Sequence, residues 1–120
     1  MPGGARAKRS GTEAERKVKR AFEAFGWKVV RSGGSLGAAD LACFKSGKVL
    51  LVQVKRRAGS RRYTSEYIEI EGFEIYTVVD FGRGDFRIEK SGRIISKRSM
   101  SLEDFLSNLQ TELDTRQLER

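Results

Sequence analysis

Hydrophobic residues recur at helical spacing in two segments, one near each end of the chain. In residues 12–25 this spacing predicts an amphipathic helix with one buried face. The capping-box pair Thr12 and Glu15 would begin it, and Gly26 would stop it. Near the other end, Ser101 is placed to cap a second helix. We expect both apolar stripes to lie in the core, with part of the second available to a dimer. The stripes consist of Ala14, Val18, Ala21, Phe22 and Phe25, and of Leu102, Phe105, Leu106, Leu109 and Leu113.

Between these helices, the pattern changes to short apolar segments separated by Gly and Ser, which predicts β-strands. The Gly-rich segment 33–39 is expected to be a flexible loop, and 66–71 is compatible with a strand or a short helix. The order of elements predicts an α/β fold with a central mixed sheet flanked by helices. The length of 120 residues suits one domain, at 11–120, after a basic flexible arm at 1–10. The strands are expected at 27–32, 40–44, 48–55, 73–81, 85–92 and 93–96.

Polar residues interrupt the most hydrophobic segment, "DLACFKSGKVLLVQVK" at 40–55. If Ser46 and Gly47 form a two-residue hairpin loop, Asp40 lies directly opposite Gln53, with Cβ atoms about 4.5–5.5 Å apart. Lys55 emerges on the same face, because side chains alternate along a strand. A carboxylate, an amide oxygen and an ammonium group then meet at one end of the strand pair. The alternative is three unrelated structural roles: a turn cap, a strand-pairing amide and the first exposed residue after the strand.

This set of groups suits the chemistry of a hard metal ion. The carboxylate of Asp40 and the amide oxygen of Gln53 can hold Mg²⁺, which takes few protein ligands and keeps several waters. The carbonyl of Val54 would add a third oxygen, and Glu15, on the flank of the buried helix face, a second carboxylate. Such an ion activates a bound water and neutralises charge on a phosphoryl group, while Lys55 positions the water or stabilises the phosphate. The set therefore predicts metal-assisted hydrolysis of a phosphodiester.

The composition excludes several kinds of catalytic site. The chain has no histidine, which rules out histidine bases, histidine metal ligands and Ser-His or Cys-His nucleophiles. The one cysteine, Cys43, lies in an apolar segment and is expected to be buried and reduced. That environment is typical of a cytoplasmic protein, or of a viral protein in the cytoplasm of its host. No apolar run reaches the roughly 18 residues needed to span a membrane, and no motif points to a small-molecule cofactor.

The charge of the chain points to a nucleic acid. The formal net charge is +8, and residues 45–62 contain Lys and Arg but no Asp or Glu. A basic surface of this kind attracts a polyanion; the alternative is a basic loop that is merely solvated. Tyr63 and Tyr67 either stack on exposed bases or pack in the core or an interface. The arginines expected to contact DNA are Arg9, Arg31, Arg56, Arg57, Arg61 and Arg62.

Four motifs in residues 11–55, "GTEAERKVKRAFEAFGWKVVRSGGSLGAADLACFKSGKVLLVQVK", occur in the order typical of one nuclease family. They are Gly11 with Glu15, the Val-Val-Arg-Ser strand and Gly-Ser loop at 29–35, the Asp-Leu pair at Asp40, and the Gln-x-Lys motif ending at Lys55. On these motifs the chain strongly resembles the archaeal-type Holliday junction resolvases, which belong to the PD-(D/E)XK nuclease superfamily. The segment "SLEDFL" (101–106) also resembles the start of the family's C-terminal helix.

The resemblance implies a restriction-endonuclease-like fold for the nuclease domain and a homodimer that binds a four-way DNA junction. It implies paired, symmetric nicks made with Mg²⁺, for which Mn²⁺ would substitute. Glu15, Asp40 and Gln53 would hold the metal. Lys55 would act at the water or the phosphate. Ser35, together with Ser32 as a DNA-binding residue, would belong to the loop that shapes the site or touches the DNA.

Two features depart from the family. Gln53 stands where the family usually has a carboxylate, and the loss of a full charge weakens metal binding. Segment 56–72 is short and broken by Gly and Ser, whereas the family has a longer helix there. Two alternatives therefore stay open: another PD-(D/E)XK DNA nuclease that acts on flaps, nicks or mismatches, and a non-catalytic junction-binding protein.

Overall fold

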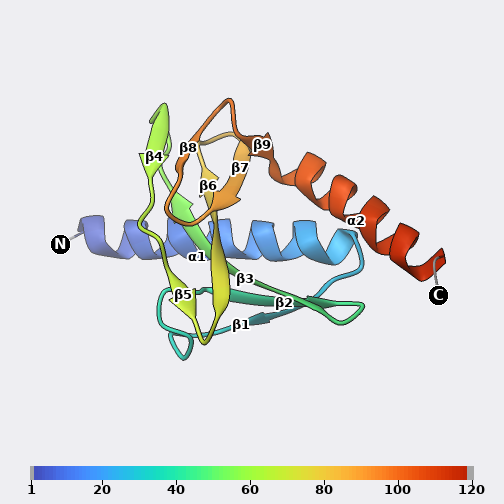
Figure 1. The fold of residues 1–120 in the computed structure, drawn as a ribbon. Helices are drawn as coiled ribbons and strands as arrows, with labels where there is room; N and C mark the ends of the chain where they lie inside the picture. The colour runs from blue at the N-terminus through green and yellow to red at the C-terminus, as the bar shows by residue number, and fades with distance from the viewer. Residues whose placement is uncertain (1, 119–120) are drawn as a thin grey trace.

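The fold consists of two helices and a mixed β-sheet (Figure 1). The computed structural model describes residues 2–118, and it describes side chains for 11–116 and for Leu118. Helix α1 spans Pro2–Ala24 and helix α2 spans Leu102–Leu118. The strands are β1 (Lys28–Arg31), β2 (Leu41–Lys45), β3 (Lys48–Arg56), β4 (Arg62–Thr64), β5 (Glu69–Ile70), β6 (Phe73–Asp80), β7 (Phe86–Lys90), β8 (Ile94–Ser96) and β9 (Met100–Ser101).

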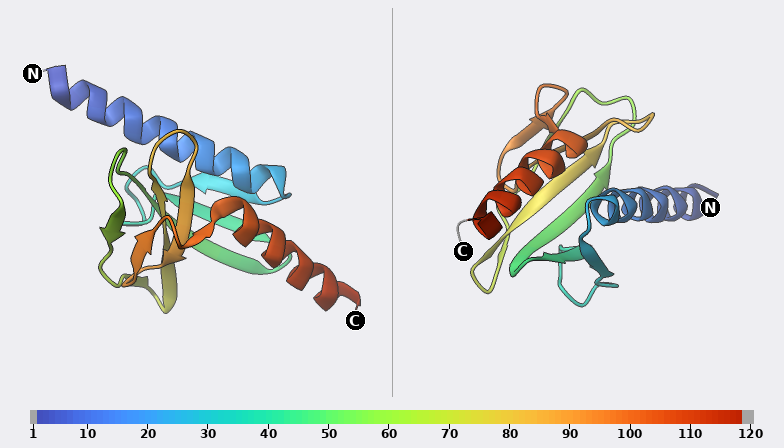
Figure 2. Two further views of the ribbon diagram at one scale, coloured as in Figure 1. Left: turned by 90° about the horizontal axis from the view of Figure 1, so that it is seen from above. Right: turned by 90° about the vertical axis from the view of Figure 1, so that its right-hand side faces the viewer.

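The main sheet has the order β1-β2-β3-β6-β7-β9, with β5 paired to the start of β6. Only the central pair, β3 with β6, is parallel, and the other pairs of this sheet are antiparallel. A second, two-stranded sheet is made by β4 and β8. The predicted α/β class with a central mixed sheet is therefore confirmed. Figures 1 and 2 show the C-terminal ends of both helices at the same end of the molecule.

Both predicted helical stripes lie in one core. Ala14, Val18 and Phe22 of α1 pack with Leu106 and Leu109 of α2 against one face of the sheet. At the start of α2, the backbone N–H of Asp104 donates to the hydroxyl of Ser101 over 3.1 Å, which is the predicted cap. The opposite face of the sheet carries a smaller cluster that includes Ala39, Ala42, Leu51 and Ile75.

The hairpin that joins β2 to β3 has the predicted register. Phe44 lies opposite Val49, and Lys45 lies opposite Lys48. The loop residues Ser46 and Gly47 both have positive φ, at 51° and 78°. Two successive residues with positive φ make the turn that matches the twist of a two-residue hairpin, and Gly takes this conformation without strain. This turn fixes which residues of β2 and β3 face each other.

Three local predictions need correction or completion. Helix α1 begins at Pro2 instead of residue 12, so Thr12 and Glu15 are interior helical residues and not a capping box. Proline suits the first turn of a helix, and after Gly3 and Gly4 the segment 5–9 consists of Ala, Arg and Lys, which favour helix. The flexibility predicted for the basic arm at 1–10 remains a prediction. The undecided segment 66–71 contributes the short strand β5, and residues 94–96 pair with β4 outside the main sheet.

Within residues 2–118, neither helix is long and apolar enough to cross a membrane. The thiol of Cys43 is fully buried, as predicted, and burial raises its pKa to about 12. A thiol with so high a pKa stays protonated at neutral pH and is unreactive. Cys43 is thus a core residue.

Candidate active site at the start of strand β2

Asp40, just before the start of β2, is tied to two residues of β3. Its backbone N–H donates to the carbonyl of Val52 over 2.8 Å. Its carboxylate Oδ2 accepts a hydrogen bond from the backbone N–H of Val54 over 2.7 Å. Its own carbonyl accepts from the N–H of Ser32 over 2.9 Å, which holds it to the end of β1. The carboxylate is therefore fixed where the backbone pairing of β2 and β3 stops.

Gln53 and Lys55 emerge from β3 on the same face as Leu51, which belongs to the smaller core cluster. Val54, between them, is buried in the main core on the other face. Because the N–H and C=O of one strand residue point to the same side of the strand, the Val54 carbonyl leaves β3 on the side where its N–H meets Asp40. Gln53, Val54 and Lys55 thus leave β3 beside the point where Asp40 is bound, with Gln53 and Lys55 on one face.

Glu15 reaches this edge from helix α1. It lines a cavity of about 480 Å³ between α1, the end of β1 and the loop that follows. Within this cavity, Arg31 Nη2 and Glu15 Oε2 are 3.1 Å apart. The cavity is lined by Thr12, Glu15, Arg31, Ser32, Gly33, Gly34 and Asp40. Four predicted site residues are therefore gathered in one depression, and Gln53 and Lys55 lie on the neighbouring strand.

The electrostatics of Asp40 reflect this crowding. Burial raises the pKa of the Asp40 carboxyl above its ordinary value of 3.8, and the nearby charge of Glu15 raises it further. The hydrogen bond from Val54 and the positive charges of Lys55 and Arg31 oppose this increase in the pKa without cancelling it. The ionisation of Asp40 therefore depends on the charges of Glu15, Lys55 and Arg31.

The loop after β1 is held by its serines. The Ser32 hydroxyl donates to the carbonyl of Ala39 over 2.5 Å and closes the loop at its base. Ser35 is exposed, and its hydroxyl donates to the carbonyl of Ser32 over 2.6 Å. Gly33 and Gly34 have φ of 60° and 91°, a region that glycine adopts readily. Ser32 thus lines the cavity itself, whereas Ser35 stabilises the turn beside it.

The arginines expected to contact DNA differ in their surroundings. Arg56 Nε lies 3.6 Å from Oδ2 of the buried Asp80. The guanidinium of Arg57 lies over the ring of Tyr63, 5.0 Å from its centroid. Arg61 and Arg62 are exposed, and Arg9 lies outside the residues whose side chains the structure describes.

Tyr63 and Tyr67, for which base stacking and packing were the alternatives, have different surroundings in the structure. Tyr63 packs against the cluster of Val79, Phe81 and Ile95, which fits a packing role. Tyr67 is 58% exposed, and its hydroxyl donates to the carboxylate of Glu69 over 2.7 Å. Tyr67 is therefore the one of the two that offers an accessible ring.

The oxygen atoms at this edge fit a hard divalent cation. Among the described residues, no group of three or more His, Cys, Asp or Glu side chains is placed to hold a metal. A cation here would rest on two carboxylates, Glu15 and Asp40, together with the neutral oxygens of Gln53 and Val54. Mg²⁺ binds through few protein oxygens and keeps several waters. A set of oxygen donors of this kind suits a hard divalent cation.

Several residues near the site were missed from the sequence. Thr12 lies three residues before Glu15 on the same helix face, a spacing that the sequence does show. Thr77 is the register partner of Gln53 on β6, and it is fully buried. Its hydroxyl has no hydrogen-bond partner among the described residues. The parallel pairing of β3 with β6 that places Thr77 there had no local signal in the sequence.

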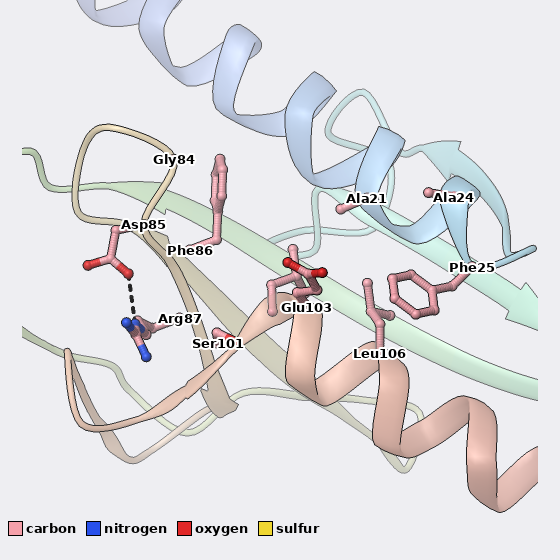
Figure 3. A pocket seen from close by; sticks show the side chains of 11 residues that line it. Ala21, Ala24, Phe25, Gly84, Asp85, Phe86, Arg87, Ser101, Glu103 and Leu106 are labelled. Atoms are coloured by element: carbon pink, nitrogen blue, oxygen red, sulfur yellow. Dashed lines mark hydrogen bonds and ion pairs between the residues drawn. The ribbon is translucent and has the colours of Figure 1, made fainter.

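A second cavity, of about 490 Å³, lies away from these residues (Figure 3). It is formed by the end of α1, the β6–β7 connection and the start of α2, with Phe25, Phe86 and Leu106 in its walls. Asp85 and Arg87 form an ion pair of 2.7 Å at its edge. It contains none of the predicted site residues.

The architecture that carries this site is a mixed sheet with two helices, and the acidic edge lies beside the lysine of strand β3. A sequence profile of the archaeal Holliday junction resolvase (Hjc) family matches residues 6–91, and the chain belongs to this family. The protein therefore has the function of a Holliday junction resolvase, a DNA-binding nuclease of a family that generally uses a divalent metal. Strands β8 and β9 and helix α2 lie beyond the matched segment.

The fold comparison agrees with the family. The structure is similar to that of Archaeoglobus fulgidus Hjc, a Holliday junction resolvase from an archaeal hyperthermophile, with a TM-score of 0.58 and 15% identity. The match covers 82% of this chain and 96% of that chain. At this identity the likeness concerns the fold alone. No curated protein matches the sequence significantly.

Proposed function

We propose that this resolvase nicks opposing strands of a four-way DNA junction symmetrically, by phosphodiester hydrolysis, with Mg²⁺ or Mn²⁺ held beside the start of β2. One observation carries the proposal: the Asp40 carboxylate is fixed to the backbone of Val54, between Gln53 and Lys55, in the cavity that also contains Glu15. A carboxylate held by a backbone N–H needs no reorganisation when its ligand arrives.

The chain supplies the ligands from three elements. The ion would be held by Asp40, just before the start of β2, by Glu15 of α1, and by the side-chain oxygen of Gln53 and the backbone oxygen of Val54 on β3. When bound, it lowers the pKa of a water and neutralises charge on the phosphoryl group. Binding through atoms on a helix and two paired strands keeps the site rigid.

Lys55 contributes the mobile positive charge. Its ammonium lies on the face of Gln53 and within electrostatic reach of Asp40. It orients the attacking water or the scissile phosphate, as a flexible chain with three donors can do. Ser32 and Ser35 shape the loop that contains Gly33 and Gly34, and they bring the backbone of this loop toward the DNA.

The DNA surface extends from this cavity along the basic loop after β3. Arg61 and Arg62 are exposed there and are available to phosphates. Arg56 and Arg57 are partly engaged by Asp80 and Tyr63, which orients their guanidinium groups. Arg9 would add a contact from α1. These contacts position the junction, and they carry no sequence preference by themselves.

A homodimer is the simplest way to cut two strands. Each chain has one such acidic edge, and symmetric nicks need two of them related by a twofold axis. We accordingly infer a homodimer that acts on DNA in the cytoplasm.

The test is a cleavage assay on a synthetic four-way junction with one strand labelled at a time, in Mg²⁺ and in EDTA, beside linear duplex of the same sequence. Paired nicks on opposing strands, only with metal and only in the junction, are expected. Equal cutting of flaps or nicked duplex would favour another nuclease of the superfamily. Tight junction binding without nicks in Mg²⁺ or Mn²⁺ would make the protein a binder on a nuclease fold.

A further inference from the structure

We propose that the divalent ion and the junction bind to this chain cooperatively, because a DNA phosphate must draw Arg31 away from Glu15 before the site holds the ion well. This inference rests on the proposed metal site, and it deepens that proposal by assigning Arg31 the role of a coupling residue. Arg31 acts through Glu15, so it is a positioning residue and not a catalytic one.

The first step is the charge of the site. Glu15 and Asp40 carry two negative charges, and Arg31 and Lys55 carry two positive ones. Gln53 adds an oxygen but no charge. The set is formally neutral, so in the free protein a divalent cation gains little from electrostatic attraction. Removing water from Mg²⁺ costs much free energy, and binding to a neutral site offsets little of that cost.

The second step is the engagement of the two carboxylates. Arg31 Nη2 lies 3.1 Å from Glu15 Oε2, within hydrogen-bond distance. Asp40 already uses Oδ2 to accept the N–H of Val54. An arginine keeps its charge at any physiological pH, so proton loss does not release Glu15. A competing anion is needed.

The third step is access to Arg31. Its side chain is 40% exposed, whereas that of Glu15 is 23% exposed, so the guanidinium is the outer member of the pair. Gly33 and Gly34 follow it in the cavity lining, and an added Cβ at either would meet no atom within 4 Å. The mouth of the cavity beside Arg31 is therefore open to a phosphate, and a guanidinium binds phosphate through two parallel hydrogen bonds.

The consequence is a linkage between the two ligands. A phosphate that engages Arg31 frees Glu15 to bind the ion. A further phosphate oxygen supplies the negatively charged ligand that the neutral amide of Gln53 does not provide. Linkage is reciprocal, so the ion must strengthen junction binding by the factor by which the junction strengthens ion binding. The protein would thus load its ion mainly on the substrate.

The experiment measures junction affinity by fluorescence anisotropy in Ca²⁺ and in EDTA at matched ionic strength, with the junction checked as uncut. Ca²⁺ is the probe because it binds the same oxygen ligands. Calorimetric titration of Ca²⁺ into the free protein and into the complex measures the Ca²⁺ affinity with and without the junction, which completes the thermodynamic cycle. We expect the ion to tighten junction binding about tenfold, within the usual range of coupling between sites.

Arg31→Ala should raise the Ca²⁺ affinity of the free protein by about five- to tenfold and reduce the coupling, since Glu15 is then always available. Lys90→Ala is the matched control: it removes one positive charge from an ion pair with Glu74, 3.5 Å long, and neither residue lines the cavity. It should leave the coupling unchanged. Circular dichroism establishes that both variants are folded.

Asp40→Asn separates failure of this inference from failure of the proposed site. If Asp40→Asn responds to Ca²⁺ as the unchanged protein does, the ion acts on the DNA alone, and both the site and the coupling are wrong. If Asp40→Asn abolishes Ca²⁺ binding, but the unchanged protein binds Ca²⁺ equally well with and without the junction, the site stands and the coupling is overturned. Unchanged coupling in Arg31→Ala likewise overturns the role of Arg31.

Discussion

The carboxylate of Asp40 accepts a hydrogen bond of 2.7 Å from the backbone N–H of Val54, on the neighbouring strand. A side chain here takes the place of the next backbone pairing between β2 and β3. The bond is satisfied equally well by an amide oxygen, because only an acceptor is required. The structural and the metal-binding roles of Asp40 can therefore be separated by one substitution.

Asp40→Asn is expected to reduce junction cutting by at least about a hundredfold, since a metal ligand of this kind is worth several kcal/mol to the transition state. Junction affinity in EDTA should change little, because the fold and the basic surface remain. Cleavage and gel-shift assays measure the two quantities. Asp114→Asn, on the exposed face of α2, is the control for amide substitution. An Asp40→Asn protein that cuts normally would remove Asp40 from the active site.

The raised pKa of Asp40 makes cutting sensitive to acid. Burial, followed by the charge of Glu15, raises the pKa of this carboxyl above 3.8, so the group takes up a proton at a higher pH than an ordinary aspartate. Protons and the metal compete for the same oxygen atoms. The acidic limb of the pH–rate profile should therefore move to lower pH as Mg²⁺ is increased. A limb that does not move with Mg²⁺ would assign the titration to another group.

The same pKa shift predicts the stability of the Asp40→Asn variant. A carboxyl with a raised pKa in the folded state contributes stability that is present below its unfolded pKa, near 3.8, and is lost as the pH rises through the folded pKa. At pH 7 the ionised group therefore costs stability, and a neutral amide does not. Asp40→Asn should be at least as stable as the unchanged protein in urea at pH 7, and the difference should shrink toward pH 4.

Gln53→Glu restores a negative charge beside Asp40. We expect cutting to persist and to reach half its maximal rate at a lower Mg²⁺ concentration, by about tenfold, because an opposite charge at ligand distance favours the bound cation. The ion should also bind more tightly without DNA. Gln53→Ala provides the comparison, since it removes the amide oxygen. Unfolding of Gln53→Glu would show that the amide is needed for packing against β6.

Much of this site was predictable because it is local in sequence. The hairpin turn at Ser46 and Gly47 fixes the register of β2 with β3 as far as Leu41 and Val52. Asp40 directly precedes Leu41, which puts it at the edge where Gln53 and Lys55 emerge. The apolar stripes of both helices were equally local. The predicted start of α1 was wrong, because a capping-box pattern inside a longer helix looks the same in sequence as one at the beginning of a helix.

The remaining features depend on contacts between distant segments. Arg31 was expected to meet DNA and Glu15 to meet metal, and their ion pair appears only once α1 packs beside the end of β1. The parallel pairing of β3 with β6, which sets Thr77 beside Gln53, crosses a long connection that local patterns do not specify. Alternation along single strands cannot reveal such partners.

Thr77→Val tests the buried hydroxyl beside Gln53. Thr77 is fully buried, and its Oγ1 has no partner in the described part of the chain. Replacing an unpaired buried hydroxyl by a methyl group of the same shape should raise the free energy of unfolding by about 1–2 kcal/mol. Urea denaturation measures the change. Thr111→Val, on an exposed helix face, should have a much smaller effect, and a destabilised Thr77→Val protein would show that the hydroxyl is hydrogen-bonded.

The exposed arginines after β3 should set the salt dependence of junction binding. Each phosphate contact releases counterions, so the slope of log K against log salt changes by about 0.9 per contact in B-form DNA. The double substitution Arg61→Ala with Arg62→Ala should therefore flatten the slope by about 1.8, while the cutting of a saturated junction is retained. Arg116→Ala, on α2, removes a charge away from this loop and should leave the slope as it is. An unchanged slope in the double variant would place the DNA on another face of the molecule.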